Sequence, residues 1–147
     1  MRAPTAECSH EAWVMVLIEY PEPYAVIRLS PEDEMPFWAT RGRFTSITRA
    51  PGELSVICPE HSVPPTQHAE RGWYLLDCGG PFSFDTVGIL AELTAVLSKA
   101  NIPLLAVATY DTDFILTRDQ TAARVALQNA GHEVVSKGYA EGAVSKE

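Results

Sequence analysis

The apolar residues in the second half of the chain recur at spacings typical first of a strand and then of a helix. Residues 73–78 form a bulky run that ends at Gly79-Gly80, which predicts a strand followed by a turn. From Val87 the apolar residues recur every three or four positions, which predicts an amphipathic helix that ends before Pro103. Ser83 precedes this stripe, so we expect its hydroxyl to be the N-cap of the helix.

The alternation of strand and helix patterns continues to residue 135. Thr117 and Gln120 have the spacing of a capping box at the start of a second helix, and Gly131 is the favoured residue just after its end. The expected elements are a strand at 104–108, a strand at 114–116, a helix at about 119–130 and a short strand at 132–135. The order of elements is therefore strand, helix, strand, strand, helix, strand.

The first half of the chain carries a shorter version of the same pattern. A βαββ pattern followed by a full βαββαβ pattern suggests a tandem duplication whose first copy is degenerate. We expect strands at 13–18 and 24–29, a short link through 36–38, and a hairpin that pairs 44–48 with 54–58 across Pro51-Gly52. The predicted division is a degenerate module at 11–69, a complete module at 70–139, and flexible tails at 1–10 and 140–147.

Composition and charge narrow the class of partner. The chain has a formal net charge of −8 and a pI near 4.9, which disfavours nucleic acid and anionic membranes because these bind Lys and Arg. The apolar run at 13–18 is too short to cross a bilayer and follows no basic segment, so we expect neither a signal peptide nor a transmembrane helix. Cys8, Cys58 and Cys78 form no CxxC pair, which favours a reducing compartment, the cytoplasm.

The segment that joins the strand at 73–78 to the following helix is the first candidate for ligand binding. Gly79 and Gly80 would let backbone amides approach a ligand, and the helix N-terminus favours an anion such as a carboxylate. Gly88, inside the predicted helix, suggests a close contact there. The competing interpretation is a turn that needs its glycines for geometry alone.

The second candidate is the polar turn Thr109-Tyr110-Asp111-Thr112-Asp113. Its carboxylates would bind an ammonium or guanidinium group through charge-assisted hydrogen bonds. The two segments together would recognise a free amino acid or a similar zwitterion. Taken alone, the turn has the simpler interpretation of a solvated polar turn, because Asp and Thr are ordinary turn residues.

Residue patterns typical of enzymes and metal sites are absent. The histidines have no HExxH arrangement, and Cys58 with His61 supplies at most two of the ligands that a structural zinc needs. No GxSxG motif and no acid, base and nucleophile set occur in one place. We therefore predict no enzyme, no catalytic residue, no metal site and no cofactor.

Several segments resemble the ACT-domain proteins of the CASTOR type, a family that includes small bacterial amino-acid-binding proteins and the arginine sensors of animals. The segments are 54–59, the strand at Trp73, the F-D-x-x-G-I motif at 84–89 and the T-Y-x-T-D-F motif at 109–114. Ala108 replaces the usual serine of the family. The resemblance covers most of residues 24–135 and implies an α+β fold of ferredoxin-like βαββαβ ACT modules in tandem, the first one degenerate.

The resemblance also implies a ligand site at an interface between modules. Asp113 would be the partner of a cationic side chain, and Pro103 and Leu104 would come from a second copy of the chain, so a homodimer is expected. Thr86 stands where the arginine sensors have an acidic residue, so a neutral or shorter amino acid is an equal alternative to arginine. The ligand-binding residues are then Ser83, Phe84, Asp85, Thr86, Gly88, Ile89, Pro103, Leu104, Thr109, Tyr110, Asp111 and Asp113.

Two functions follow from these patterns. The first is a cytoplasmic amino-acid sensor that regulates a partner protein, with its ligand at an interface between modules or between protomers. The second is a structural or protein-interaction ACT dimer that binds no ligand. A thermal response to an amino acid distinguishes the two.

Overall fold

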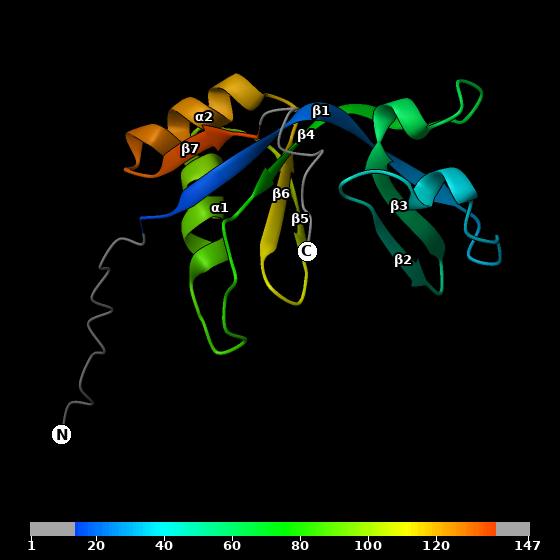
Figure 1. Cartoon of the computed structure of the whole chain (residues 1–147), viewed down its shortest axis with the longest axis horizontal. Coiled ribbons are helices and arrows are strands. Elements are labelled where there is room, and N and C mark those ends of the chain that lie inside the picture. The colour runs from blue at the N-terminus through cyan, green and yellow to red at the C-terminus, as the bar shows by residue number, and fades with distance from the viewer. Residues whose placement is uncertain (1–13, 138–147) are drawn as a thin grey trace, which may run out of the picture.

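A seven-stranded sheet with two α-helices on one face forms the framework of the protein (Figure 1). The structure is a computed structural model, and it describes residues 14–137. The predicted tails at 1–10 and 140–147 lie outside the described residues, as does Trp13. The elements are β1 (Val16–Leu29), η1 (Phe37–Thr40), β2 (Ser46–Ala50), β3 (Glu53–Pro59), η2 (Glu60–Ser62), β4 (Glu70–Asp77), α1 (Ile89–Lys99), β5 (Leu104–Ala108), β6 (Asp113–Thr117), α2 (Gln120–Asn129) and β7 (Glu133–Ser136), where η marks a 3-10 helix.

The long strand β1 organises the sheet. The strand order is β2-β3-β1-β4-β6-β5, and β7 pairs with β1 in parallel, whereas the other pairs are antiparallel. Along one edge, β1 pairs with β7 over Val16–Glu19 and with β3 over Tyr24–Leu29. Along its other edge, β1 pairs with β4. Figure 1 shows β1 running from the helices at one end of the sheet to the β2–β3 hairpin at the other.

This single strand corrects the expectation of two separate strands at 13–18 and 24–29. Pro21 and Pro23 interrupt the pattern between those ranges, and proline cannot donate a hydrogen bond to a neighbouring strand. The pairing with β4 shifts register between Glu19 and Pro23, and such an irregularity leaves part of the ladder unbonded. The strand therefore accommodates both prolines and continues.

The order of elements in the second half is confirmed, because β4, α1, β5, β6, α2 and β7 follow one another as strand, helix, strand, strand, helix, strand. The part of the first half that the structure describes, 14–69, contains three strands and two 3-10 helices, and the link expected at 36–38 is η1. β7 pairs with β1 rather than with β4, so the first half places a strand inside the sheet of the second half. The division into modules at 11–69 and 70–139 stays a prediction.

Both faces of the sheet are buried where β4 pairs with β6. This explains why the paired parts of these strands are continuously apolar rather than alternating. Leu76 and Ile115, paired across β4 and β6, face α1 and α2. Their chain neighbours Leu75 and Leu116 form the next pair and belong to a second cluster on the other face, which also contains Phe44. Neither α-helix of the described part is long and apolar enough to cross a membrane.

The second α-helix lies where the sequence predicts it, but a different residue caps it. The carboxylate of Asp119 accepts a hydrogen bond from the amide of Ala122 at 3.0 Å and forms the N-cap of α2. The expected cap, Thr117, is instead the buried last residue of β6, because that strand continues one residue further than predicted. Gly131 follows the helix with a φ of 95°, as expected for the residue after a helix end.

Candidate functional site

The loop between β4 and α1 lies against the turn between β5 and β6. The amide of Cys78 donates to the carbonyl of Asp113 at 2.9 Å, and the amide of Phe82 donates to the carbonyl of Asp111 at 2.6 Å. These hydrogen bonds continue the pairing of β4 with β6 beyond the ends of the strands. The two candidate segments of the sequence therefore lie side by side at one end of the sheet.

The close approach of this loop and turn requires Gly79 and Gly80. Gly79 has a φ of 83°, and a Cβ on Gly80 would lie 2.4 Å from the carbonyl oxygen of Asp111. The amide of Gly79 donates to the carboxylate of Asp77 at 2.9 Å, and that of Gly80 donates to the hydroxyl of Thr112 at 3.1 Å. These two amides are therefore hydrogen-bonded within the protein, and local geometry accounts for the glycine pair.

The first α-helix begins later than the sequence predicts. α1 starts at Ile89, and its N-cap is Gly88, whose φ of 90° lies in the left-handed region that favours glycine. The expected cap, Ser83, accepts a hydrogen bond from the amide of Asp85 at 3.2 Å inside the preceding loop. No side chain caps α1, so the amides of its first turn are left without a partner in the helix.

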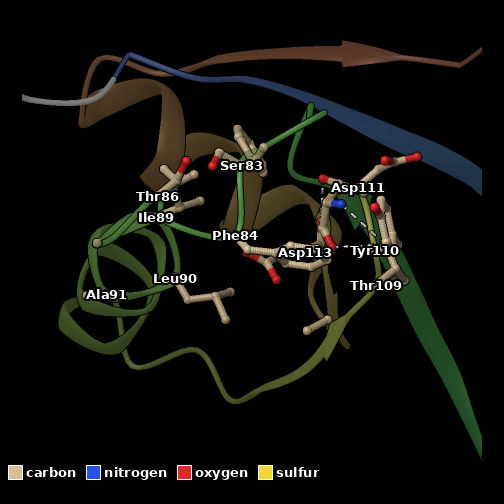
Figure 2. Close-up of a pocket in the computed structure, with 14 residues that line it drawn as sticks. Ser83, Phe84, Thr86, Ile89, Leu90, Ala91, Thr109, Tyr110, Asp111 and Asp113 are labelled. Atoms are coloured by element: carbon tan, nitrogen blue, oxygen red, sulfur yellow. Dashed lines mark hydrogen bonds between the residues drawn. The ribbon is translucent and has the colours of Figure 1, made fainter.

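A hollow of about 340 Å³ lies between the start of α1 and the β5–β6 turn (Figure 2). From the predicted set it is lined by Ser83, Phe84, Thr86, Gly88, Ile89, Thr109, Tyr110, Asp111 and Asp113. Sequence reasoning missed the rest of the lining, which consists of Phe82, Leu90, Ala91, Ala108 and Thr112. Leu90 and Ala91 lie in the first turn of α1. A predicted N-cap at Gly88 instead of Ser83 would have placed both residues at the helix start and identified them as lining residues.

Three residues of the predicted set lie away from this hollow. Asp85 is an exposed loop residue and is not part of the lining. Pro103 and Leu104, at the opposite end of β5 from Ala108, line a separate hollow of about 360 Å³ beside the end of α1. Within one chain the structure therefore does not bring Pro103 and Leu104 to the other residues.

The two walls of the first hollow have opposite polarity. The β5–β6 turn contributes the carboxylates of Asp111 and Asp113, and none of the lining residues is basic. The opposite wall is the N-terminus of α1, where the first hydrogen bond runs from the amide of Glu92 to the carbonyl of Gly88. The amides of 89–91 precede that bond and lie in the lining segment, so this wall favours an anion, whereas the turn favours a cation.

Two exposed aromatic rings meet at the hollow. Phe84 of the loop and Tyr110 of the turn pack edge to face, with ring centroids 4.9 Å apart and an interplanar angle of 79°. Figure 2 shows the side chains of Phe84 and Tyr110 close together beside Asp113. The two residues are 75% and 78% exposed, so together they present an apolar surface next to the charged groups that a ligand or a partner would cover.

The buried cysteines of the described residues are free thiols in apolar surroundings. Burial raises the pKa of Cys58 to about 11. Burial, with smaller contributions from the carboxylates of Asp113 and Asp77, raises the pKa of Cys78 to about 12. Both thiols are therefore protonated at neutral pH and are weak nucleophiles. Within residues 14–137 no group of three or more His, Cys, Asp or Glu side chains could hold a metal ion.

Comparison with family models finds two matches in the chain. A model described as an ACT domain matches residues 68–126, a range that contains every residue lining the first hollow. A second model, described as an N-terminal domain, matches residues 22–66. The boundary between the two matches lies between η2 and β4.

Comparison with solved structures finds similar folds over most of the chain. The protein Atu0741 from Agrobacterium tumefaciens is 34% identical, with a TM-score of 0.81 over 87% of this chain and 97% of that chain. The protein VC0802 from Vibrio cholerae, described as of unknown function and a possible transport protein, is 16% identical, with a TM-score of 0.64 over 80% of this chain and 90% of that chain. The allosteric aspartate kinase from Clostridium acetobutylicum is 12% identical, with a TM-score of 0.54 over 74% of this chain and 33% of that chain, and at these two identities the likeness concerns the fold alone.

Proposed function

The chain belongs to the family of Atu0741 and carries an ACT domain, and from this premise we propose that it is a regulatory protein that binds a free amino acid or a similar small zwitterion. ACT domains are in general ligand-binding regulatory modules. The observation that carries the proposal is the hollow itself, because it sets the carboxylates of Asp111 and Asp113 opposite the uncapped N-terminus of α1. We expect the protein to act as a binding module and not as an enzyme.

In this proposal each part of the ligand meets a matching wall. The ligand carboxylate accepts hydrogen bonds from the first amides of α1, where the helix dipole also stabilises an anion. The ligand ammonium, or a cationic side chain, binds Asp113 with Asp111 beside it. The hydrocarbon part packs on Phe84 and Leu90. An ordinary amino acid fits a hollow of about 340 Å³ with room for water.

The finer assignment is to the CASTOR type of ACT protein, a cytoplasmic sensor that acts on a partner protein. The unbridged, buried thiols of Cys58 and Cys78 support a reducing compartment, because neither is part of a disulfide.

We propose that the protein is a homodimer in which each copy completes the site of the other. The two hollows described above lie at opposite ends of the seam between α1 and β5. A second copy placed antiparallel on this seam, about a twofold axis, brings its Pro103 and Leu104 against the first hollow. β5 supports this arrangement because it is an end strand without a charged residue, and such strands tend to pair.

A thermal-shift panel with each standard amino acid at millimolar concentration tests the proposed function. At about 100 times Kd a ligand adds about 2.7 kcal/mol of stability, which raises the Tm of a chain of this size by roughly 5–10 °C. With any amino acid that responds, Asp113→Ala is expected to weaken binding by roughly 10- to 100-fold, because a charge-assisted hydrogen bond is lost.

The matched control is Glu34→Ala, which removes the same charge at an exposed position far along the chain from the hollow. It should leave the response unchanged, and Asp113→Ala should unfold at nearly the native temperature without ligand. A panel in which no amino acid shifts the Tm would contradict the sensor and favour an ACT dimer that binds no ligand.

A further inference from the structure

The carboxylate of Asp77 is the centre of a hydrogen-bond cluster behind the hollow. Its Oδ1 accepts a hydrogen bond from the amide of Gly79 at 2.9 Å and one from the hydroxyl of Thr112 at 3.4 Å. The Thr112 hydroxyl in turn accepts a hydrogen bond from the amide of Gly80 at 3.1 Å. Asp77 is the last residue of β4 and is not part of the lining of the hollow.

The two hydrogen bonds of the Thr112 hydroxyl, to Asp77 and from Gly80, join the two segments that form the walls, whereas the bond from Gly79 to Asp77 is local to the loop. Gly79 and Gly80 begin the loop that leads to α1, whereas Thr112 stands between Asp111 and Asp113 in the β5–β6 turn. The backbones are already in close contact here, because a Cβ on Gly80 would lie 2.4 Å from the carbonyl oxygen of Asp111. The cluster therefore adds side-chain hydrogen bonds to the backbone bonds of Cys78 and Phe82, and together they set the position of Asp111 and Asp113 relative to the loop.

The Thr112 hydroxyl depends on Asp77 for its orientation. A hydroxyl has one proton, and here it has two acceptors at 3.4 Å, Oδ1 of Asp77 and the backbone oxygen of Asp113. Donation to Oδ1 of Asp77 ties the turn to the end of β4, and it leaves a lone pair of the hydroxyl for the amide of Gly80. Without Asp77, the Gly79 amide loses its acceptor. The Thr112 hydroxyl, which accepts a hydrogen bond from the Gly80 amide, also loses the acceptor that orients it.

We infer that Asp77 is a positioning residue for the ligand site: it holds the β5–β6 turn and the loop before α1 at the separation that the ligand requires, without touching the ligand itself. The inference rests on the proposed function for its effect on affinity, whereas its effect on the loop is independent of any ligand. The acceptor oxygen of Asp77 matters more than its charge, because the cluster depends on Oδ1 as an acceptor for two donors.

The test compares Asp77→Ala with Asp77→Asn, which keeps an acceptor oxygen in place, and Thr112→Val with Thr112→Ser, which keeps the hydroxyl. The first readout is the amide hydrogen exchange of Gly79 and Gly80 in the protein without ligand. The second is the Kd for L-arginine, a probe with a carboxylate and two cationic groups, measured by calorimetry. Asp119→Ala, which removes the N-cap of α2, is the control for a general loss of stability.

Asp77→Ala and Thr112→Val are expected to speed exchange of the glycine amides and to weaken L-arginine binding by about tenfold, the equivalent of one to two ordinary hydrogen bonds. Asp77→Asn and Thr112→Ser are expected to restore both readouts, and Asp119→Ala is expected to lower the Tm without changing either one. Equal weakening by Asp77→Asn and Asp77→Ala, or unchanged exchange in Asp77→Ala, would overturn the inference. If native protein does not bind L-arginine, the exchange data still decide whether Asp77 fixes the loop, and the proposed function is then judged by the amino-acid panel.

Discussion

The carbonyl oxygen of Asp111 leaves no room for a side chain at residue 80. The neighbouring Gly79 has both a positive φ and no room for a Cβ, which would lie 2.2 Å from the carbonyl oxygen of Val16, whereas Gly80 needs only the absence of a Cβ. Gly88 is a third case, because its positive φ turns the chain into α1 at the edge of the hollow. From the sequence all three look alike, and only their packing separates a glycine that shapes the loop from one that borders the ligand site.

Gly80→Ala should therefore destabilise the protein and disturb the ligand site together. The added Cβ would meet the carbonyl oxygen of Asp111 at 2.4 Å and the Cβ of Thr112 at 2.7 Å, so the turn has to move. We expect a loss of about 1–3 kcal/mol in the free energy of unfolding, measured by urea denaturation. Gly52→Ala is the control, because nothing lies within 4 Å of its added Cβ, and it should change stability by less than about 1 kcal/mol. Equal effects of the two substitutions would show that the loop does not constrain residue 80.

The start of α1 shows how far local sequence signals identify an element. The stripe of apolar residues locates the body of the helix correctly, because Ile89, Leu93 and Leu97 are its buried positions. The hydroxyl of Ser83 suits an N-cap and equally suits the loop turn that it forms with Asp85. Only contacts with the distant β5–β6 turn choose between these two uses, so the sequence alone misplaces the helix start by about one and a half turns.

At the level of whole elements, a buried ion pair fastens α2 to β1 and β7. Glu19 of β1 has a side chain 4% exposed, and Arg124 of α2 binds it with both Nε at 2.7 Å and Nη2 at 2.9 Å. The hydroxyl of Ser136 in β7 adds a third hydrogen bond to the same carboxylate at 3.3 Å. The hydrogen bonds to Glu19, with the attraction of its opposite charge, raise the pKa of the Arg124 guanidinium.

Arg124→Ala should consequently cost more than the loss of a surface ion pair. It leaves the Glu19 carboxylate buried with the Ser136 hydroxyl, and we expect a loss of about 2–3 kcal/mol, below the usual range for a buried pair because Arg124 is itself partly exposed. Arg118→Ala removes the exposed pair with Glu70 and should cost about 1 kcal/mol or less. Urea denaturation of both variants measures the two losses in the free energy of unfolding. Similar losses would mean that the buried Glu19 carboxylate does not need Arg124 as its partner.

On the scale of the whole molecule, the sequence identifies the elements better than the sheet that they form. Residues 104–108 and the hairpin of β2 with β3 lie close to their predicted places because each is set by a local apolar run or a turn. The insertion of β1 between β7 and β4 depends on pairing between distant parts of the chain, more than a hundred residues apart for β1 and β7, for which a single sequence has no signal. The two candidate segments lie together because β4 pairs with β6, and both the residue patterns and the family resemblance predict this convergence.

Two end strands of the sheet, β5 and β2, provide a direct test of the proposed dimer. β5 and β2 each have five residues, but β2 contains Arg49, whereas β5 consists of leucine, alanine and valine. Ala106→Lys places an ammonium at the exposed centre of β5, where the twofold axis would set it against the same group of the second copy. We therefore expect sedimentation analysis to show a dimer for the native protein and a monomer for Ala106→Lys. Thr48→Lys, at the exposed centre of β2, should remain a dimer. If the second copy supplies its Pro103 and Leu104 to the ligand site, the monomeric variant should also bind the amino acid more weakly. A native protein that binds the amino acid as a monomer would exclude the shared site.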